Sequence, residues 1–142
     1  MTLDTGQLAR SLKTLESSLQ LLHQAAPDSI EYEVFRNATI KGFELTLETA
    51  GKLLRKAVKR YEANPKEVDA LVFKDVLRHA GKHGMLELEA IERWFAYRDN
   101  RNSTAYDYGE AFAKETLMLL TGFQRDVAAL IHTLTALPGN DA

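Results

Sequence analysis

The residues best suited to chemistry lie together in one polar run, residues 98–110, between two segments with apolar periodicity. The run combines arginines, acids, asparagines and tyrosines. If Arg101 lies near a helix end, its guanidinium can bind a phosphate through two parallel hydrogen bonds. The structural alternative is that Arg101 pairs with Asp99 or Asp107, because charged helix ends often serve only as solvated surface. The run therefore predicts either anion binding or helix-end electrostatics.

The same run is predicted to interrupt a helical pattern. The side chains of Asn100, Asn102, Ser103 and Thr104 compete with backbone hydrogen bonds, which favours a helix end, a turn and a new helix start. A polar junction held between long rigid helices is a usual position for a functional site. We therefore expect the chemistry of this chain at this junction.

The composition is typical of an ordinary globular chain. Its 142 residues predict one domain over residues 1–137 and a flexible tail at 138–142. A net charge of −2 gives no global basic footprint for nucleic acid, but it leaves room for a local basic patch. The absence of cysteine excludes disulfides and thiolate chemistry. Without a membrane-length apolar run or a signal-peptide pattern, we expect a cytoplasmic protein with no membrane partner.

Apolar periodicity predicts the elements that must position the polar run. Leucines recur at spacings of three and four along residues 6–25, which predicts an amphipathic helix. A second, long helix is predicted from a cap at Asp28 or Ser29 to a stop at Asn64 and Pro65. Further helices are predicted at residues 73–82, 88–100 and 109–137. No run alternates like a strand, so the predicted fold is an all-α, up-and-down helical bundle of three long and two short helices.

The second helix carries two features of its own. Gly42 and Gly51 should each cost about 1 kcal/mol relative to alanine, which indicates close approach of a neighbouring helix. Its C-terminal half is rich in bases, which suits the helix dipole. These bases are Lys52, Arg55, Lys56, Lys59 and Arg60.

Two histidines have the spacing of a metal-binding pair. His79 and His83 stand four residues apart, which can place two imidazoles on one ion. Gly81 and Gly84 indicate that the helix ends there, and no third ligand follows at a metalloenzyme spacing. We therefore expect no metal site and no cofactor.

Three segments resemble the HEPN superfamily, and more closely its small helical members named as nucleotidyltransferase substrate-binding subunits or as toxins. The segments are FELTLETAGKLLRK at residues 43–56, FKDVLRHAGKHGML at 73–86 and RNSTAYDY at 101–108. The last one carries most of the resemblance, because the family pattern is Arg, usually Asn, three residues, His, one residue and Tyr. Arg101, Asn102 and Tyr108 match this pattern, whereas Tyr106 stands at the His position.

The resemblance implies a metal-independent ribonuclease site. In such proteins the arginine binds phosphate, and the histidine acts as acid or base while an RNA 2′-hydroxyl attacks the neighbouring phosphate. Here Arg101 would bind the phosphate with Asn102 as its support, and Tyr106 would take the catalytic position. A phenol with a pKa near ~10 is a poor base at neutral pH. The resemblance therefore implies an endoribonuclease that is weakened or inactive.

The resemblance also implies partners and further site residues. Its members pair with a minimal nucleotidyltransferase as toxin and antitoxin, and they form homodimers with a shared cleft. In some toxins the tyrosine at the position of Tyr108 is adenylylated by the partner. Arg98, Ser103 and Thr104 would contribute to the substrate site, and Glu44 would turn inward to support the arginine.

Two functions remain open at this point. The chain is either the toxin of such a pair, with RNA as its substrate, or a non-catalytic subunit that supplies substrate-binding surface to the nucleotidyltransferase. Three aromatic residues lie just before the motif and bear on the dimer. Trp94 and Phe95 are expected in the core of the chain, whereas Tyr97 is the better candidate for a contact with a second copy.

Overall fold

The computed structural model describes the backbone of residues 3–104 and 110–138 and the side chains of residues 3–100 and 113–138. Its helices are α1 Gly6–Gln24, α2 Ile30–Lys59, α3 Pro65–Val68, α4 Phe73–Lys82, α5 Leu88–Thr104 and α6 Glu110–Thr135. The described residues contain no strand, so the predicted all-α helical bundle is confirmed. None of the described helices is both long and apolar enough to cross a membrane.

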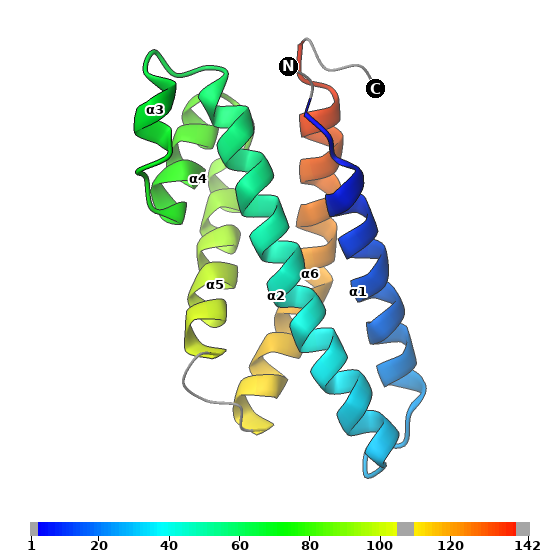
Figure 1. Ribbon diagram of the computed structural model, residues 1–142. Helices are drawn as coiled ribbons and strands as arrows, with labels where there is room; N and C mark the ends of the chain where they lie inside the picture. Colours follow the sequence, from blue (N-terminus) through cyan, green and yellow to red (C-terminus); the bar gives the residue numbers. More distant parts are fainter. Residues whose placement is uncertain (1–2, 105–109, 139–142) are drawn as a thin grey trace.

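The long helices extend roughly along one axis (Figure 1). In the same view α3 and α4 gather beside the C-terminal end of α2. The helix α1 begins and α6 ends at one end of the bundle, and α5 ends at the opposite end. The last turn of α5, which belongs to the polar run, therefore lies at the end of the bundle opposite to the start of α1.

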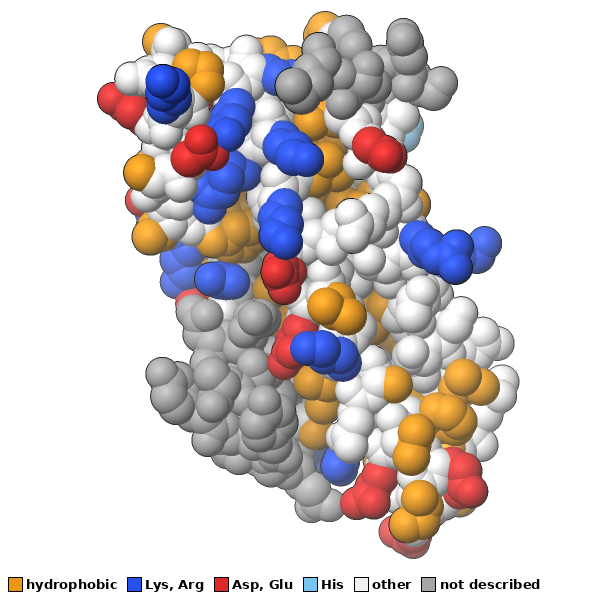
Figure 2. Space-filling model, viewed as in Figure 1, with side chains coloured by type: hydrophobic (Ala, Val, Ile, Leu, Met, Phe, Trp, Pro, Cys, Tyr) orange, Lys and Arg blue, Asp and Glu red, His pale blue; other side chains and the backbone are white. Residues whose placement is uncertain are grey.

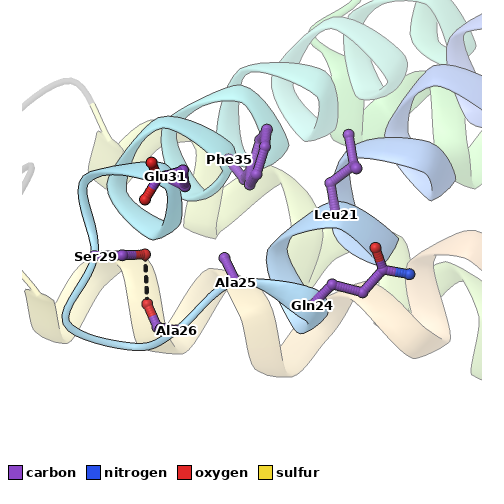
Figure 3. Close-up of a pocket in the computed structure, with 7 residues that line it drawn as sticks. All are labelled: Leu21, Gln24, Ala25, Ala26, Ser29, Glu31 and Phe35. Atoms are coloured by element: carbon purple, nitrogen blue, oxygen red, sulfur yellow. Dashed lines mark hydrogen bonds between the residues drawn. The ribbon is translucent and has the colours of Figure 1, made fainter.

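The α1–α2 turn begins with a well-formed helix cap. Ser29 Oγ accepts a hydrogen bond of 3.1 Å from the backbone N–H of Tyr32, as the predicted cap requires. The same hydroxyl donates to the carbonyl oxygen of Ala26 at 2.6 Å. Figure 3 shows the hollow beside this turn, with Leu21 of α1 and Phe35 of α2 among the residues that line it.

Two glycines of α2 lie where neighbouring elements come close. A Cβ atom on Gly42 would lie 3.4 Å from Cδ1 of Leu15, which is an ordinary contact with α1. A Cβ atom on Gly51 would lie 2.8 Å from Cε1 of Phe73, which is closer than packed atoms allow. The predicted close approach is confirmed at both glycines. It is tighter at Gly51, where a ring of α4 fills the space that a side chain would need.

An aromatic cluster joins α2, α5 and α6 in the core. The ring of Phe123 packs edge to face on Phe43, Trp94 and Tyr97, with ring centres 4.7, 5.8 and 5.0 Å away. Trp94 and Tyr97 are only 1% and 2% exposed, whereas Phe95 is half-buried. The expectation that Tyr97 contacts a second copy is wrong, because the core of its own chain encloses the ring.

Two element boundaries differ from the predictions. The helix α5 continues to Thr104 instead of ending at Asn100, because the Asn100 side chain bonds to Thr116 of α6 instead of competing with the helix backbone. The helix α2 ends at Lys59, and the short helix α3 begins at Pro65. Four residues are too few to show a period, so the sequence did not predict α3.

Candidate functional site

The polar run, residues 98–110, lies where α5 ends and α6 begins. Residues 101–104 form the last turn of α5, and their side chains lie outside the described residues. Tyr106 and Tyr108 lie outside the described residues altogether. The roles assigned to these residues therefore stay predictions. The surroundings of these residues are described by the side chains of α5 up to Asn100 and by those of α6 from Ala113.

Asn100 fixes the last turn of α5 against α6. Its side chain is 3% exposed, and its Oδ1 accepts a hydrogen bond of 3.1 Å from Oγ1 of Thr116, which is fully buried. A buried polar contact of this kind specifies one arrangement of the two helices, because leaving either group unpaired costs about 1–3 kcal/mol. Arg101 follows directly in the chain, so this contact also fixes where its backbone lies.

A second polar contact between α5 and α6 lies one to two turns before Arg101. Arg93 donates from Nε and Nη2 to the two carboxylate oxygens of Asp126, each at 2.8 Å. The hydroxyl of Tyr97 donates to the same carboxylate at 2.5 Å. Asp126 is 6% exposed, whereas the side chain of Arg93 is 48% exposed. We call Arg93, Tyr97 and Asp126 the Asp126 network.

The network holds two of its members in fixed protonation states. Burial, and then the hydrogen bond to Asp126, raise the pKa of Tyr97, so this phenol keeps its proton at neutral pH. The hydrogen bond to Asp126 also raises the already high pKa of Arg93. The phenol and the guanidinium therefore act as permanent donors that connect α5 to α6.

Sequence reasoning did not identify the Asp126 network, although one signal was present. Asp126 stands in the apolar stripe of α6, three residues after Phe123 and four before Leu130. An acid on a buried stripe needs a charged or hydrogen-bonding partner. Arg93 and Tyr97 are four residues apart on one face of α5 and could have been proposed as that partner.

Arg98, a predicted substrate-binding residue, lies between α5 and α4. Its guanidinium carbon is 5.5 Å from the centre of the Phe73 ring, which is within cation–π range. Its neighbour Asp99 pairs with Lys74 of α4 at 2.8 Å. Arg98 is partly exposed, so a cation stands one helical turn before Arg101.

Glu44 and Glu48, one turn apart on α2, have different environments. Glu48 is 51% exposed and lies 3.4 Å from Lys52, as expected for a solvated surface pair. The side chain of Glu44 is 16% exposed, with Lys41 at 3.9 Å. Glu44 is therefore turned inward, and its predicted support of Arg101 stays a prediction.

The imidazoles of His79 and His83 both face the carboxylate of Glu62, which lies just after α2. His79 Nδ1 contacts one carboxylate oxygen, and His83 Nε2 lies 3.3 Å from the other. The pair therefore joins α4 to the residues that follow α2. In the part of the chain that the structure describes, no group of three or more histidine or acidic side chains is arranged to hold a metal ion.

The chain is a small all-helical bundle, and comparison with known families identifies the family to which it belongs. The model of the family described as nucleotidyltransferase substrate binding protein like matches residues 3–136. The match spans nearly the whole chain and includes all three segments that resemble HEPN proteins. The chain belongs to this family.

A curated sequence and a solved structure, both from Haemophilus influenzae, are similar to the chain. One, named probable ribonuclease HepT, is 27% identical over 106 residues, which are 75% of this chain and 71% of the relative. The other is a solved structure described as the fold of a substrate binding domain of a nucleotidyltransferase. It matches with a TM-score of 0.80 at 23% identity and covers 92% of this chain and 98% of that one. At this identity the structural likeness supports the fold alone.

Proposed function

We propose that the chain is the HEPN partner of a minimal nucleotidyltransferase and the toxin of a toxin–antitoxin pair. The observation that carries the proposal is the family match over residues 3–136, which includes the Arg101 motif. The similarity to a relative named as a probable ribonuclease also supports a ribonuclease toxin. In this role the chain binds its partner enzyme and presents the end of α5 to RNA.

The proposed ribonuclease site is the last turn of α5. Arg101, supported by Asn102, holds the scissile phosphate while the ribose 2′-oxygen loses its proton and attacks phosphorus. The bond to the 5′-oxygen of the next nucleotide breaks, that oxygen takes up a proton, and a 2′,3′-cyclic phosphate remains; the reaction needs no metal ion. Tyr106 stands where an acid–base group is required. A phenol with a pKa near ~10 can donate a hydrogen bond at neutral pH but removes a proton poorly. We therefore expect weak cleavage or none from the chain as it stands. Further donors to the substrate are Arg98, Ser103 and Thr104.

RNA cleavage in vitro by the chain and by Tyr106→His tests this site. An imidazole titrates near neutrality, and a positioned acid–base group contributes roughly 10²–10⁴-fold to the rate. Tyr106→His is expected to cleave, and adding Arg101→Ala is expected to abolish the cleavage. If Tyr106→His does not cleave, the ribonuclease proposal fails.

The tyrosine at position 106 favours a second candidate function. A non-catalytic subunit that supplies substrate-binding surface to the nucleotidyltransferase needs no histidine there. In this function, and in the toxin, Tyr108 is the proposed acceptor of a transferred nucleotide. Incubation with the partner and ATP should add one AMP to the intact chain and none to Tyr108→Phe, as measured by mass spectrometry. Addition of AMP to both proteins would exclude Tyr108 as the acceptor.

A second copy of the chain completes the proposed arrangement. A symmetric homodimer would bring two Arg101 residues into one cleft, so that both can contact the same RNA. Light scattering coupled to gel filtration measures the mass directly. A monomer at micromolar concentration would contradict the shared cleft.

A further inference from the structure

The C-terminal half of α2 carries a concentrated positive charge. Residues 49–60 contain five basic residues and no acid, although the chain as a whole has a net charge of −2. Figure 2 shows blue side chains gathered along this half of α2 and beside it. We call this surface the basic face. Its residues are Lys52, Arg55, Lys56, Lys59 and Arg60.

Two of these cations have acidic neighbours. Lys52 lies 3.4 Å from Glu48, but 74% of its side chain is exposed. Lys59 lies 2.5 Å from Asp69, whose side chain is 58% exposed. Exposed pairs of this kind are held by about 1 kcal/mol or less, so a phosphate can replace the carboxylate.

The other three cations have no carboxylate partner among the described residues. Nη1 of Arg55 donates to the carbonyl oxygens of Val68 and Leu71, at 2.5 and 2.9 Å, and these neutral acceptors leave its charge in place. Lys56 is exposed. Nη1 of Arg60 is buried, with no hydrogen-bond partner in the described part of the chain. The basic face therefore keeps a net positive charge.

The spacing of these cations matches a regular polyanion. Lys52, Lys56 and Arg60 succeed one another at intervals of four residues, so they share one side of α2. At a rise of 1.5 Å per residue, neighbouring cations stand about 6 Å apart along the helix axis. This is close to the separation of neighbouring phosphates in an extended nucleic-acid strand.

One aromatic ring links the start of the basic face to α5. The ring of Phe73 packs on Gly51, directly beside Lys52, with 2.8 Å between ring carbon Cε1 and the position of a Cβ on the glycine. The guanidinium of Arg98 lies over the same ring at 5.5 Å. Arg98 is one helical turn before Arg101. The ring of Phe73 therefore touches α2 beside Lys52 and also lies under the guanidinium of Arg98, one turn before the proposed ribonuclease site.

We propose that the basic face binds the phosphate backbone of single-stranded RNA and positions the strand for the last turn of α5. The proposal rests on the proposed ribonuclease function of Arg101 and adds a binding surface outside that motif. Contacts to phosphates supply affinity and position but carry no sequence information. The basic face therefore determines how tightly RNA is held and where it lies, and base preference must come from elsewhere.

The test is the binding of a labelled oligouridine, measured by fluorescence anisotropy over a series of salt concentrations. Lys52→Gln/Lys56→Gln removes two exposed cations, and glutamine keeps the helix propensity of lysine. Each lost phosphate contact lowers the salt slope by about 0.7, so the pair should lower it by about 1.4 and weaken binding about 25-fold near 0.1 M salt. The matched control, Lys13→Gln/Arg125→Gln, removes two exposed cations from α1 and α6 and should bind nearly as well as the unaltered chain.

Three results would overturn the basic face as an RNA surface. They are an absence of binding at low salt, equal losses in the variant and its control, and full competition by a polyglutamate peptide of equal charge. The ribonuclease proposal fails separately. If Tyr106→His cleaves RNA but Lys52→Gln/Lys56→Gln binds RNA as well as the unaltered chain, only the proposal for the basic face is rejected. If Lys52→Gln/Lys56→Gln loses RNA binding as expected but Tyr106→His does not cleave RNA, only the ribonuclease proposal is rejected.

Discussion

Replacing Asp126 by asparagine removes a buried charge without changing the shape of the side chain. Asp126 is 6% exposed and accepts three hydrogen bonds, two from Arg93 at 2.8 Å and one from Tyr97 at 2.5 Å. The amide keeps one oxygen for the phenol, but it presents an NH₂ group to the guanidinium. We therefore expect the substitution to weaken the attachment of α5 to α6.

The size of the loss follows from the exposure of each partner. Hydrogen bonds to a charged group contribute about 1.5–3 kcal/mol to stability. With a neutral amide as acceptor, the buried hydrogen bond from Tyr97 should contribute about half as much. Arg93 is 48% exposed and can return to water, so its share is about 1 kcal/mol or less. Asp126→Asn should therefore lower the free energy of unfolding by about 2 kcal/mol, and the melting temperature by roughly 6 °C.

Urea and thermal unfolding followed by circular dichroism measure this loss. The matched control is Asp75→Asn, which breaks the exposed pair of Asp75 and Arg78 and should cost below about 1 kcal/mol. Tyr97→Phe should also cost about 2 kcal/mol, because it removes the hydroxyl and leaves the ring packed. The double variant should cost about 1 kcal/mol less than the sum, since both changes remove one shared bond. The Asp126 network would be refuted if Asp75→Asn and Asp126→Asn lowered the free energy of unfolding equally. It would also be refuted if the losses of Asp126→Asn and Tyr97→Phe added exactly in the double variant.

Three further outcomes are expected from the packing. Gly42→Ala should stabilise the chain by up to about 1 kcal/mol, because its Cβ would meet Leu15 at an ordinary distance. Gly51→Ala should destabilise it by about 1 kcal/mol, because a Cβ 2.8 Å from the Phe73 ring forces a shift that exceeds the gain in helix propensity. The urea midpoint should rise in Gly42→Ala and fall in Gly51→Ala, and the opposite change in either variant would contradict the packing. The raised pKa of Tyr97 adds stability that is fully present below the unfolded pKa of about 10 and is lost as pH rises above it. Tyr97→Phe should flatten the alkaline loss in urea midpoints, and an unchanged slope would contradict the buried phenol.

Most of the fold could be predicted because it depends on short-range patterns. The leucine stripe of residues 6–25, the cap at Ser29 and the approach at Gly42 and Gly51 are all visible within a few residues of sequence. The structure confirms them in α1 and α2. Helix ends were harder to predict. A polar side chain that would compete for backbone hydrogen bonds in an isolated helix can instead form its hydrogen bond with another helix. Asn100 is the example, since its bond to Thr116 lets α5 continue.

The surroundings of the candidate site were predicted less completely, because they depend on pairs that are distant in sequence. Arg93 and Asp126 are separated by 33 residues, and nothing local connects them. Tyr97 was expected at a dimer contact for the same reason, since its enclosure depends on residues of α6. Charge gave a different difficulty. The five bases of the basic face are visible in the sequence, but there they were interpreted as complementing the helix dipole and not as a binding surface.

The most direct test of the proposed function is calorimetric titration of the chain with the minimal nucleotidyltransferase that this function requires as its partner. Both functions proposed for the family member require this complex, whether or not Tyr106 permits cleavage. We expect saturable binding at a fixed stoichiometry, and Arg101→Ala should bind as well as the unaltered chain if Arg101 contacts RNA and not the partner. An absence of binding would contradict the central proposal, even though the membership of the family and the helical fold would stand.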